Sequence, residues 1–344
     1  MKRLVWLLCV GAASLTAQVP RVGIIDFYGV RKVPLEKLRA ALGFQAGDRM
    51  PSSKGDVEER LEKVPGVVRA NLEAVCCEDG KAILYVGIEE KGAISFELRD
   101  PPESAVLLPP EIHSAYHRFV DLLGEAVRKG EVREDLSRGH SLIEYPPARA
   151  VQEEFVGLAG KYLPQLRETL RQSADEEARA VAAYVIGYAP NKRDIVDDLQ
   201  YAMRDPDATV RANAMRALSA VIVYAAGNPD AEIRVPLTWF VEMLNSLYWT
   251  DRHSAAVALA TFTEKRDPSL MAHLRERALP ALVEMARWQH LPHALPAFMI
   301  LGRVAGLEEK QIQDAWNRNE REAMIKACLA KLRNTSSDPL IPRK

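Results

Sequence analysis

The chain of 344 residues lacks a strong excess of charge of either sign. Its 46 lysine and arginine residues nearly balance 47 aspartate and glutamate residues, which gives a formal net charge of -1. The molecule as a whole therefore lacks the positive field that attracts nucleic acid or anionic membranes, and we expect no nucleic-acid partner. After residue 17 there is no run of about 18 consecutive apolar residues, so we expect no membrane-spanning helix once the N-terminal segment is removed.

Motifs for common chemistry are also missing. The sequence contains no GxGxxG, GxSxG or HExxH pattern and no P-loop, so neither a phosphate cradle nor a nucleophile elbow is predicted. We expect a non-enzymatic protein without a cofactor or metal. An alternative is a metal-dependent hydrolase or enzyme accessory subunit built on His113 and His117, which lie one turn apart in a predicted helix at residues 111–129. Spacing reveals no third ligand, so we expect these to be surface or packing histidines.

Cysteine is scarce, with four residues in the chain. Cys9 lies in the N-terminal segment, which leaves the adjacent Cys76 and Cys77 and the distant Cys328. Three thiols do not make a disulfide framework. Neighbouring side chains in a strand point to opposite faces, so we expect one thiol of the pair to be buried and the other exposed. A redox switch or an intermolecular disulfide is the alternative.

The N-terminal segment has the pattern of a secretory signal. Lys2 and Arg3 precede an apolar run at residues 4–10 and small residues at 11–17. This pattern predicts cleavage after Ala17 and a mature chain that is periplasmic or otherwise exported. An uncleaved N-terminal anchor is the alternative.

Residues 21–91 predict a small α+β unit. Apolar residues at 22–29, 67–75 and 82–89 indicate strands, and helical spacing at 35–42 and 56–64 indicates two short helices. Pro34 suits the first turn of the first helix, and Ser53 or Asp56 suits the cap of the second. The predicted order is β-α-α-β-β.

This unit resembles a POTRA domain. The resemblance covers roughly 70 residues and rests on the segments Phe27-Tyr28-Gly29-Val30, Gly47-Asp48, Pro65-Gly66-Val67-Val68 and Val86-Gly87-Ile88-Glu89-Glu90. It implies protein binding in which a client adds a strand to a sheet edge. Such modules usually precede a barrel or occur in series, and neither follows here. A generic α+β domain is the alternative.

The strand at residues 67–75 is the expected binding edge. Its alternation predicts that Arg69, Asn71 and Glu73 face solvent and bind a partner. The intervening side chains, Val68, Ala70, Leu72 and Ala74, are predicted to face the helices. We expect a proline at Asn71 to remove a donor from the free edge.

The second half of the chain predicts a helical repeat. Asp207 and Arg211 begin a recurring sequence pattern, called the frame below. Asp175 and Arg179 occupy the matching positions 32 residues earlier, and Arg252 repeats the position of Arg211 41 residues later. A fourth copy lacks the arginine. Arg211 follows an Asp-Pro-Asp turn, from which we expect it to bridge a carboxylate of an adjacent repeat. The frame resembles HEAT repeats, in which stacked helix pairs supply the core; a non-repetitive helical bundle is the alternative.

Together these features predict an α+β N-terminal domain followed by an all-α HEAT-like helical array, mostly α overall. We expect a signal peptide at residues 1–17, a POTRA-like domain at 18–92, a linker at 93–147, helical repeats at 148–333 and a flexible tail at 334–344. The predicted function is that of an exported adaptor or scaffold that binds cell-envelope proteins through the sheet edge and the surface of the repeats.

Overall fold

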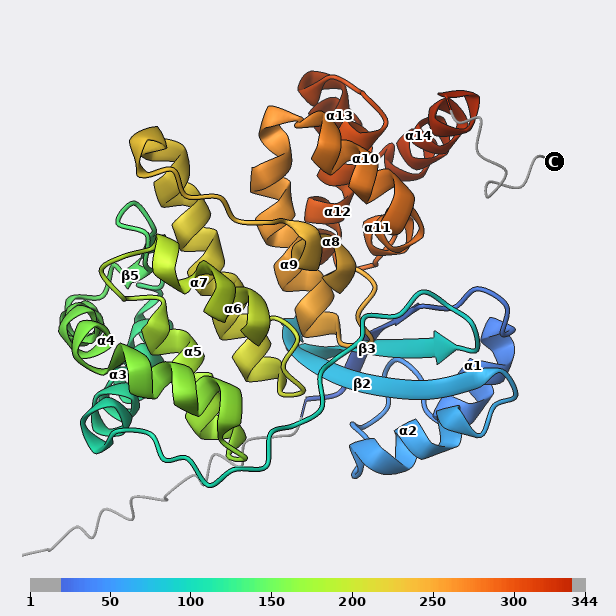
Figure 1. Ribbon diagram of the computed structural model, residues 1–344. Coiled ribbons are helices and arrows are strands. Elements are labelled where there is room, and N and C mark those ends of the chain that lie inside the picture. Colours follow the sequence, from blue (N-terminus) through green and yellow to red (C-terminus); the bar gives the residue numbers. More distant parts are fainter. Residues whose placement is uncertain (1–19, 336–344) are drawn as a thin grey trace, which may run out of the picture.

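The computed structural model describes residues 20–335. The predicted signal peptide, Cys9 and residues 336–344 of the predicted tail lie outside this range. A small unit with a β-sheet comes first, and a mostly helical array follows it (Figure 1). The predicted fold class is therefore confirmed. None of the helices in the described range is long and apolar enough to cross a membrane.

The first unit has the predicted order β-α-α-β-β. Its elements are β1 (Val22–Tyr28), α1 (Leu35–Leu42), α2 (Lys54–Glu62), β2 (Val67–Glu78) and β3 (Lys81–Glu90). Pro34 precedes α1, and Gly43 ends it in the left-handed conformation that favours glycine. The Ser53 hydroxyl accepts a hydrogen bond from the backbone of Asp56 and so caps α2.

The three strands form a mixed sheet with the order β1-β3-β2. β1 is parallel to the central strand β3, and β2 is antiparallel to it. The strand at residues 67–75 therefore lies at an edge, as predicted, and β1 forms the other edge.

Both faces of this sheet are covered. α1 and α2 pack on one face, where Leu38, Leu42 and Leu61 meet Leu84 and Val86 of β3. The opposite face lies against the helical array, and Tyr28, Ile83 and Tyr85 belong to the core of that array. Figure 1 shows the strands between α1 and α2 on one side and the array on the other. The central strand is thus buried on both faces.

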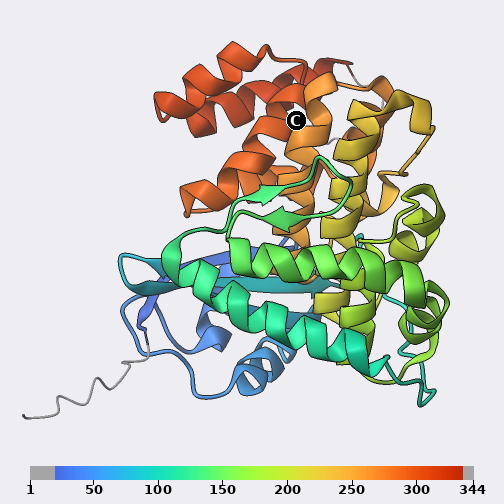
Figure 2. The same cartoon turned by 90° about the vertical axis from the view of Figure 1, so that its left-hand side faces the viewer.

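The segment between the two units contains the expected helix. This helix, α3 (Pro110–Lys129), buries Ile112, Ala115 and Phe119. After it, β4 (Glu134–Asp135) and β5 (Leu142–Ile143) form a small hairpin, visible in Figure 2, that the sequence did not reveal. Its two short strands carry too little alternation to be recognised as strands.

Helices fill the rest of the described chain. They are α4 (Pro146–Gln172), α5 (Glu176–Ile186), α6 (Val196–Ala202), α7 (Ala208–Gly227), α8 (Thr238–Met243), α9 (Trp249–Phe262), α10 (Pro268–Arg277), α11 (Leu279–Ala286), α12 (Leu291–Val304), α13 (Glu309–Asn317) and α14 (Arg321–Thr335). α3 packs along α4 and also contacts α5.

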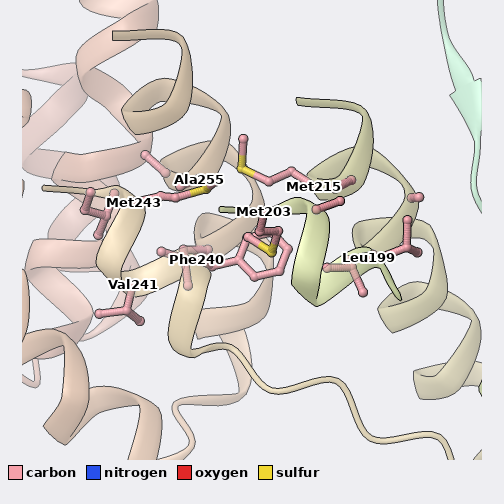
Figure 3. Packing of buried hydrophobic residues seen from close by; sticks show 14 of the residues in the cluster. Leu199, Met203, Met215, Phe240, Val241, Met243 and Ala255 are labelled. Atoms are coloured by element: carbon pink, nitrogen blue, oxygen red, sulfur yellow. The ribbon is translucent and has the colours of Figure 1, made fainter. Parts of the chain in front are cut away.

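Successive helix pairs supply one another's core. α5, α7, α9 and α12 contact one another in this order, so that each repeat packs on the next. Figure 3 shows the packing around Met203 and Phe240, where side chains of α6, α7, α8 and α9 meet. Ala214 and Ala255 are fully buried in these contacts, because a small side chain lets neighbouring helices approach closely.

The arginine frame links the repeats through buried ion pairs. Arg179 Nε lies 3.0 Å from Asp205 Oδ2, and Arg211 Nη2 lies 2.9 Å from Asp251 Oδ2. Arg211 and Asp251 are both fully buried. The prediction that Arg211 bridges a carboxylate of an adjacent repeat is therefore confirmed.

The third frame arginine also forms an ion pair, at a longer distance: Arg252 Nη1 lies 3.6 Å from Glu284 Oε2. All three arginines also donate a hydrogen bond to a backbone carbonyl in the turn before their own helix. The pairs are Arg179 with Ser173, Arg211 with Asp205 and Arg252 with Ser246. Each arginine therefore connects the turn before its own helix to a carboxylate of the next repeat.

Two prolines, Pro292 and Pro296, occur in the last part of the array, although proline usually ends or kinks a helix. Both lie within α12. Pro292 occupies the first turn, where a backbone donor has no helical partner, so the ring costs little there. Pro296 is accommodated further along the same helix.

Candidate functional site: the sheet and its two edges

Aromatic side chains join the sheet to the helical array. The Tyr85 ring of β3 stacks on Trp249 of α9 with centroids 4.8 Å apart and also contacts Trp288. Close by, the Tyr28 hydroxyl donates a hydrogen bond of 2.7 Å to the Leu247 carbonyl oxygen. A Cβ at Gly87 would collide with this same oxygen, so glycine lets the two backbones approach.

Carboxylates of the sheet bind backbone N–H groups at the starts of repeat helices. Glu73 of β2 accepts hydrogen bonds from the backbones of Trp249 and Thr250 at 2.8 and 3.1 Å. Asp26 of β1 accepts one from the backbone of Gln289, just before α12, at 2.8 Å. Burial raises the pKa of Asp26 above its usual value, while the bonds from Gln289 act against this. The first unit is therefore held in a defined position on the array.

Three histidines lie beside this interface. His293 Nδ1 lies 2.7 Å from the Tyr85 hydroxyl, and the His293 ring packs against His253 and His290 with centroids 4.8 and 4.0 Å apart. Burial lowers the pKa of both His253 and His293 to about 4, because the charged imidazolium loses its hydration. His253 and His293 are therefore neutral packing groups at neutral pH.

The structure changes the interpretation of the three predicted binding residues. Arg69 is exposed and forms an ion pair of 2.6 Å with Glu89 on the neighbouring strand. Asn71 is only 5% exposed, and Glu73 is half-buried because it binds the start of α9. The expectation that all three face solvent is wrong for Asn71 and Glu73, since the helical array covers their side of the sheet. Whether they bind a partner stays a prediction.

The helix-facing side of β2 is also only partly as predicted. Ala70 and Leu72 are buried under α1 and α2. Val68, however, is 51% exposed, and Ala74 is exposed as well. The two short helices cover the middle of the long strand and leave these residues uncovered.

Two backbone donors at the free edge of β2 are occupied within the chain. Glu62 accepts a hydrogen bond from the Ala70 backbone at 3.0 Å, and Glu58 accepts one from the Leu72 backbone at 2.7 Å. Because backbone N–H groups alternate in direction along a strand, the N–H of Asn71 points toward β3 instead. A proline at Asn71 would break the sheet's own ladder, so the expected loss of an edge donor there is wrong.

The edge of β1 borders a groove of about 600 Å³. Ile25 and Phe27 of β1 line it together with Arg39 of α1 and Ala46. The Ile25 carbonyl oxygen accepts a hydrogen bond from the Gln289 side chain, 3.0 Å away. Alternation directs the backbone of Phe27 to the same side. An extended segment in this groove would meet backbone hydrogen-bonding groups and apolar side chains. The loop that forms the wall of this groove carries no periodic signal, so the sequence does not predict the groove.

Cys76 and Cys77 differ from their prediction. Both are exposed, and a disulfide joins them at the end of β2. The expected arrangement of one buried and one exposed thiol is therefore wrong, because the strand alternation does not continue through this pair. Cys328 is a buried free thiol, and burial raises its pKa to about 11.

His113 and His117 lie far from these edges, on α3. Both are exposed, and their Nε2 atoms are 3.0 Å apart. Glu177, at the start of α5, supplies a carboxylate 3.5 Å from His117 Nε2. The sequence offered no third ligand because Glu177 belongs to a different helix, and only the packing of α3 on the array brings it near.

Comparison with known families concerns the array. Residues 163–260 match the family model of HEAT repeats. The matched range contains the five frame residues, Asp175, Arg179, Asp207, Arg211 and Arg252, and thus supports the resemblance drawn from their spacing. No curated protein matches the chain. HEAT repeats stack into extended surfaces that generally serve as protein-interaction scaffolds, which is compatible with a binding adaptor.

Proposed function

We propose that this protein is an exported, non-enzymatic adaptor that binds an extended segment of a cell-envelope protein along the outer edge of β1. The groove beside Ile25 and Phe27 is the observation that carries the proposal. Strand addition uses backbone hydrogen bonds for affinity and side-chain pockets for specificity, and it needs no catalytic residue. The POTRA-like order of the first unit supports this mode of binding.

The proposal favours β1 over the edge expected from the sequence. On β2, a partner strand would have to displace Glu58 and Glu62 from the backbone of Leu72 and Ala70. On β1, the backbone of Val22 is already bonded to Gly47 and Asp48. At Ile25, further along the same edge, the exposed side chain of Gln289 gives up one hydrogen bond. Exchange of a single exposed side chain costs less than removal of two charged acceptors.

The HEAT repeats serve in this proposal as a rigid support and as a second binding surface. Glu73, Asp26 and Tyr28 fix the sheet on the repeats through bonds to their backbone. A partner held on β1 would therefore keep a fixed orientation relative to the array. A periplasmic location rests on the signal pattern of residues 1–17, and it predicts that protein isolated from the cell envelope begins at Gln18.

Site-specific crosslinking tests the groove. A photo-reactive residue at Arg39, which lines the groove, is expected to crosslink one defined envelope protein in cells. A second change, Ala46→Trp, fills the groove and should abolish that product. Ala40→Trp is the matched control, because Ala40 is equally exposed on α1 and does not line the groove.

The outcomes separate the binding surfaces. Loss of the product with Ala46→Trp but not with Ala40→Trp supports binding at β1. An unchanged product in a folded Ala46→Trp protein refutes it and leaves the surface of the HEAT repeats as the favoured site.

A further inference from the structure

Two imidazoles on α3 are arranged like a pair of metal ligands. His113 and His117 are one helical turn apart, so they share one face of α3, and their Nε2 atoms are 3.0 Å apart. At this distance one nitrogen can donate a hydrogen bond to the other, and a bound ion would replace that bond. Two imidazole nitrogens bound to a tetrahedral zinc ion at about 2.05 Å would be roughly 3.3 Å apart, close to this separation.

A third candidate ligand lies on α5. Glu177 Oε1 lies 3.5 Å from His117 Nε2, in the first turn of α5, where Asp175 is the N-cap. His113, His117 and Glu177 form the group of His, Cys, Asp or Glu side chains in the described chain that places three ligand atoms within 4.8 Å of one another. The Glu177 side chain is 64% exposed, so a small rotamer adjustment can bring its oxygen to bonding distance.

The donor set selects the kind of ion. Two imidazole nitrogens and one carboxylate oxygen suit zinc and neighbouring transition metals, whereas magnesium and calcium prefer oxygen ligands alone. Three protein ligands leave a coordination position for water or for a group of another molecule. The exposed position of the cluster gives the ion direct access from solvent.

We propose that His113, His117 and Glu177 bind one zinc ion that links α3 to α5. The ion would join the segment between the two units to the first helix of the array, across a contact that is otherwise made by side-chain packing. This site is separate from the groove at β1, so it does not depend on the proposed peptide binding.

Calorimetric titration of the untagged, chelator-treated mature chain with zinc chloride tests the site. We expect one tight equivalent. His117→Ala and Glu177→Gln should each weaken it at least about tenfold, since loss of even an outer-sphere partner commonly costs that much. Zinc should also raise the melting temperature of the wild-type protein but not that of His117→Ala, because an ion that binds only the folded state stabilises it.

His273→Ala is the matched control. His273 also lies 3.5 Å from a carboxylate, that of Glu242, but is not part of the three-ligand group. Retention of the tight equivalent in His273→Ala and its loss in His117→Ala supports the site. The proposal is overturned if the wild-type chain binds no tight zinc, if His117→Ala binds it as well as wild type, or if His273→Ala loses it equally.

Discussion

Glu73 caps the helix that starts at Trp249, with its carboxylate 2.8 Å from the Trp249 backbone nitrogen. In two earlier repeats the residue four positions before the frame arginine is an aspartate that caps its own helix, namely Asp175 in α5 and Asp207 in α7. The equivalent residue before Arg252 is Tyr248, which makes no side-chain cap. A strand of the first unit therefore supplies the cap that the third repeat lacks.

Removing this carboxylate should destabilise the protein. For Glu73→Ala we expect a loss of about 1–2 kcal/mol in the free energy of unfolding, which is the usual cost of an N-cap together with its favourable charge at a helix N-terminus. Urea unfolding followed by tryptophan fluorescence measures it, since Trp249 lies at the affected interface.

Glu78→Ala serves as the control for this change. Glu78 is an exposed glutamate at the end of the same strand, five residues after Glu73. Equal unfolding free energies for the two variants would contradict the capping role of Glu73.

The sequence predicted the strands of the sheet and the side chains under α1 and α2, but it did not predict that the helical array covers the opposite face of the sheet. Alternation placed Ala70 and Leu72 correctly toward α1 and α2. It could not show that Asn71 and Glu73 face a helical array, because polar side chains on one face of a strand usually indicate solvent. Glu73 meets a helix that lies far away in the chain, and no local pattern records such a contact.

The repeat frame was predictable for a physical reason. Arg211 recurs at the spacing of Arg179 because each arginine performs the same task in a stacked unit, so repetition in sequence reflects repetition in structure. Glu177 beside His117 has no counterpart in other repeats. A ligand that occurs once, on a different helix, leaves no periodic signal.

Acidification should weaken the interface between the sheet and the repeats. Burial lowers the pKa of His253 from 6.5 to about 4, so the unfolded chain binds a proton there before the folded protein does. The associated stability is fully present above about pH 6.5 and is lost as the pH falls toward 4, by at most about 1.4 kcal/mol per pH unit for one histidine. His253→Phe keeps the ring stacking on Trp249 and should reduce this pH dependence.

Urea unfolding of wild type and variant at several pH values between 7 and 5 measures the difference. His140 and His293 have similarly lowered pKa values and contribute with the same sign in both proteins. The raised pKa of Asp26 acts in the opposite direction, and it too is present in both. His273→Phe controls for the loss of a histidine outside the cluster. The prediction fails if His253→Phe retains the full pH dependence of the wild-type protein.

The ion pair between Arg211 and Asp251 should make a large contribution to the free energy of unfolding of the helical array. Both side chains are fully buried, and Arg211 also donates to the carbonyl oxygens of Asp205 and Pro206. Arg211→Met leaves a buried carboxylate without its partner, for which we expect a loss of about 3–5 kcal/mol. Arg193→Met is the control, because the Arg193 side chain is exposed and outside the frame.

A double variant separates the lost attraction from the unpaired charge. Asp251→Asn removes the negative charge that Arg211→Met leaves behind, so the double variant should lose less stability than the two single variants added together. Urea is uncharged, so unfolding in urea compares the variants at constant ionic strength. If Arg211→Met costs no more than Arg193→Met, the frame arginine does not hold the repeats together. If the effects of Arg211→Met and Asp251→Asn simply add, the two residues act independently, despite their separation of 2.9 Å.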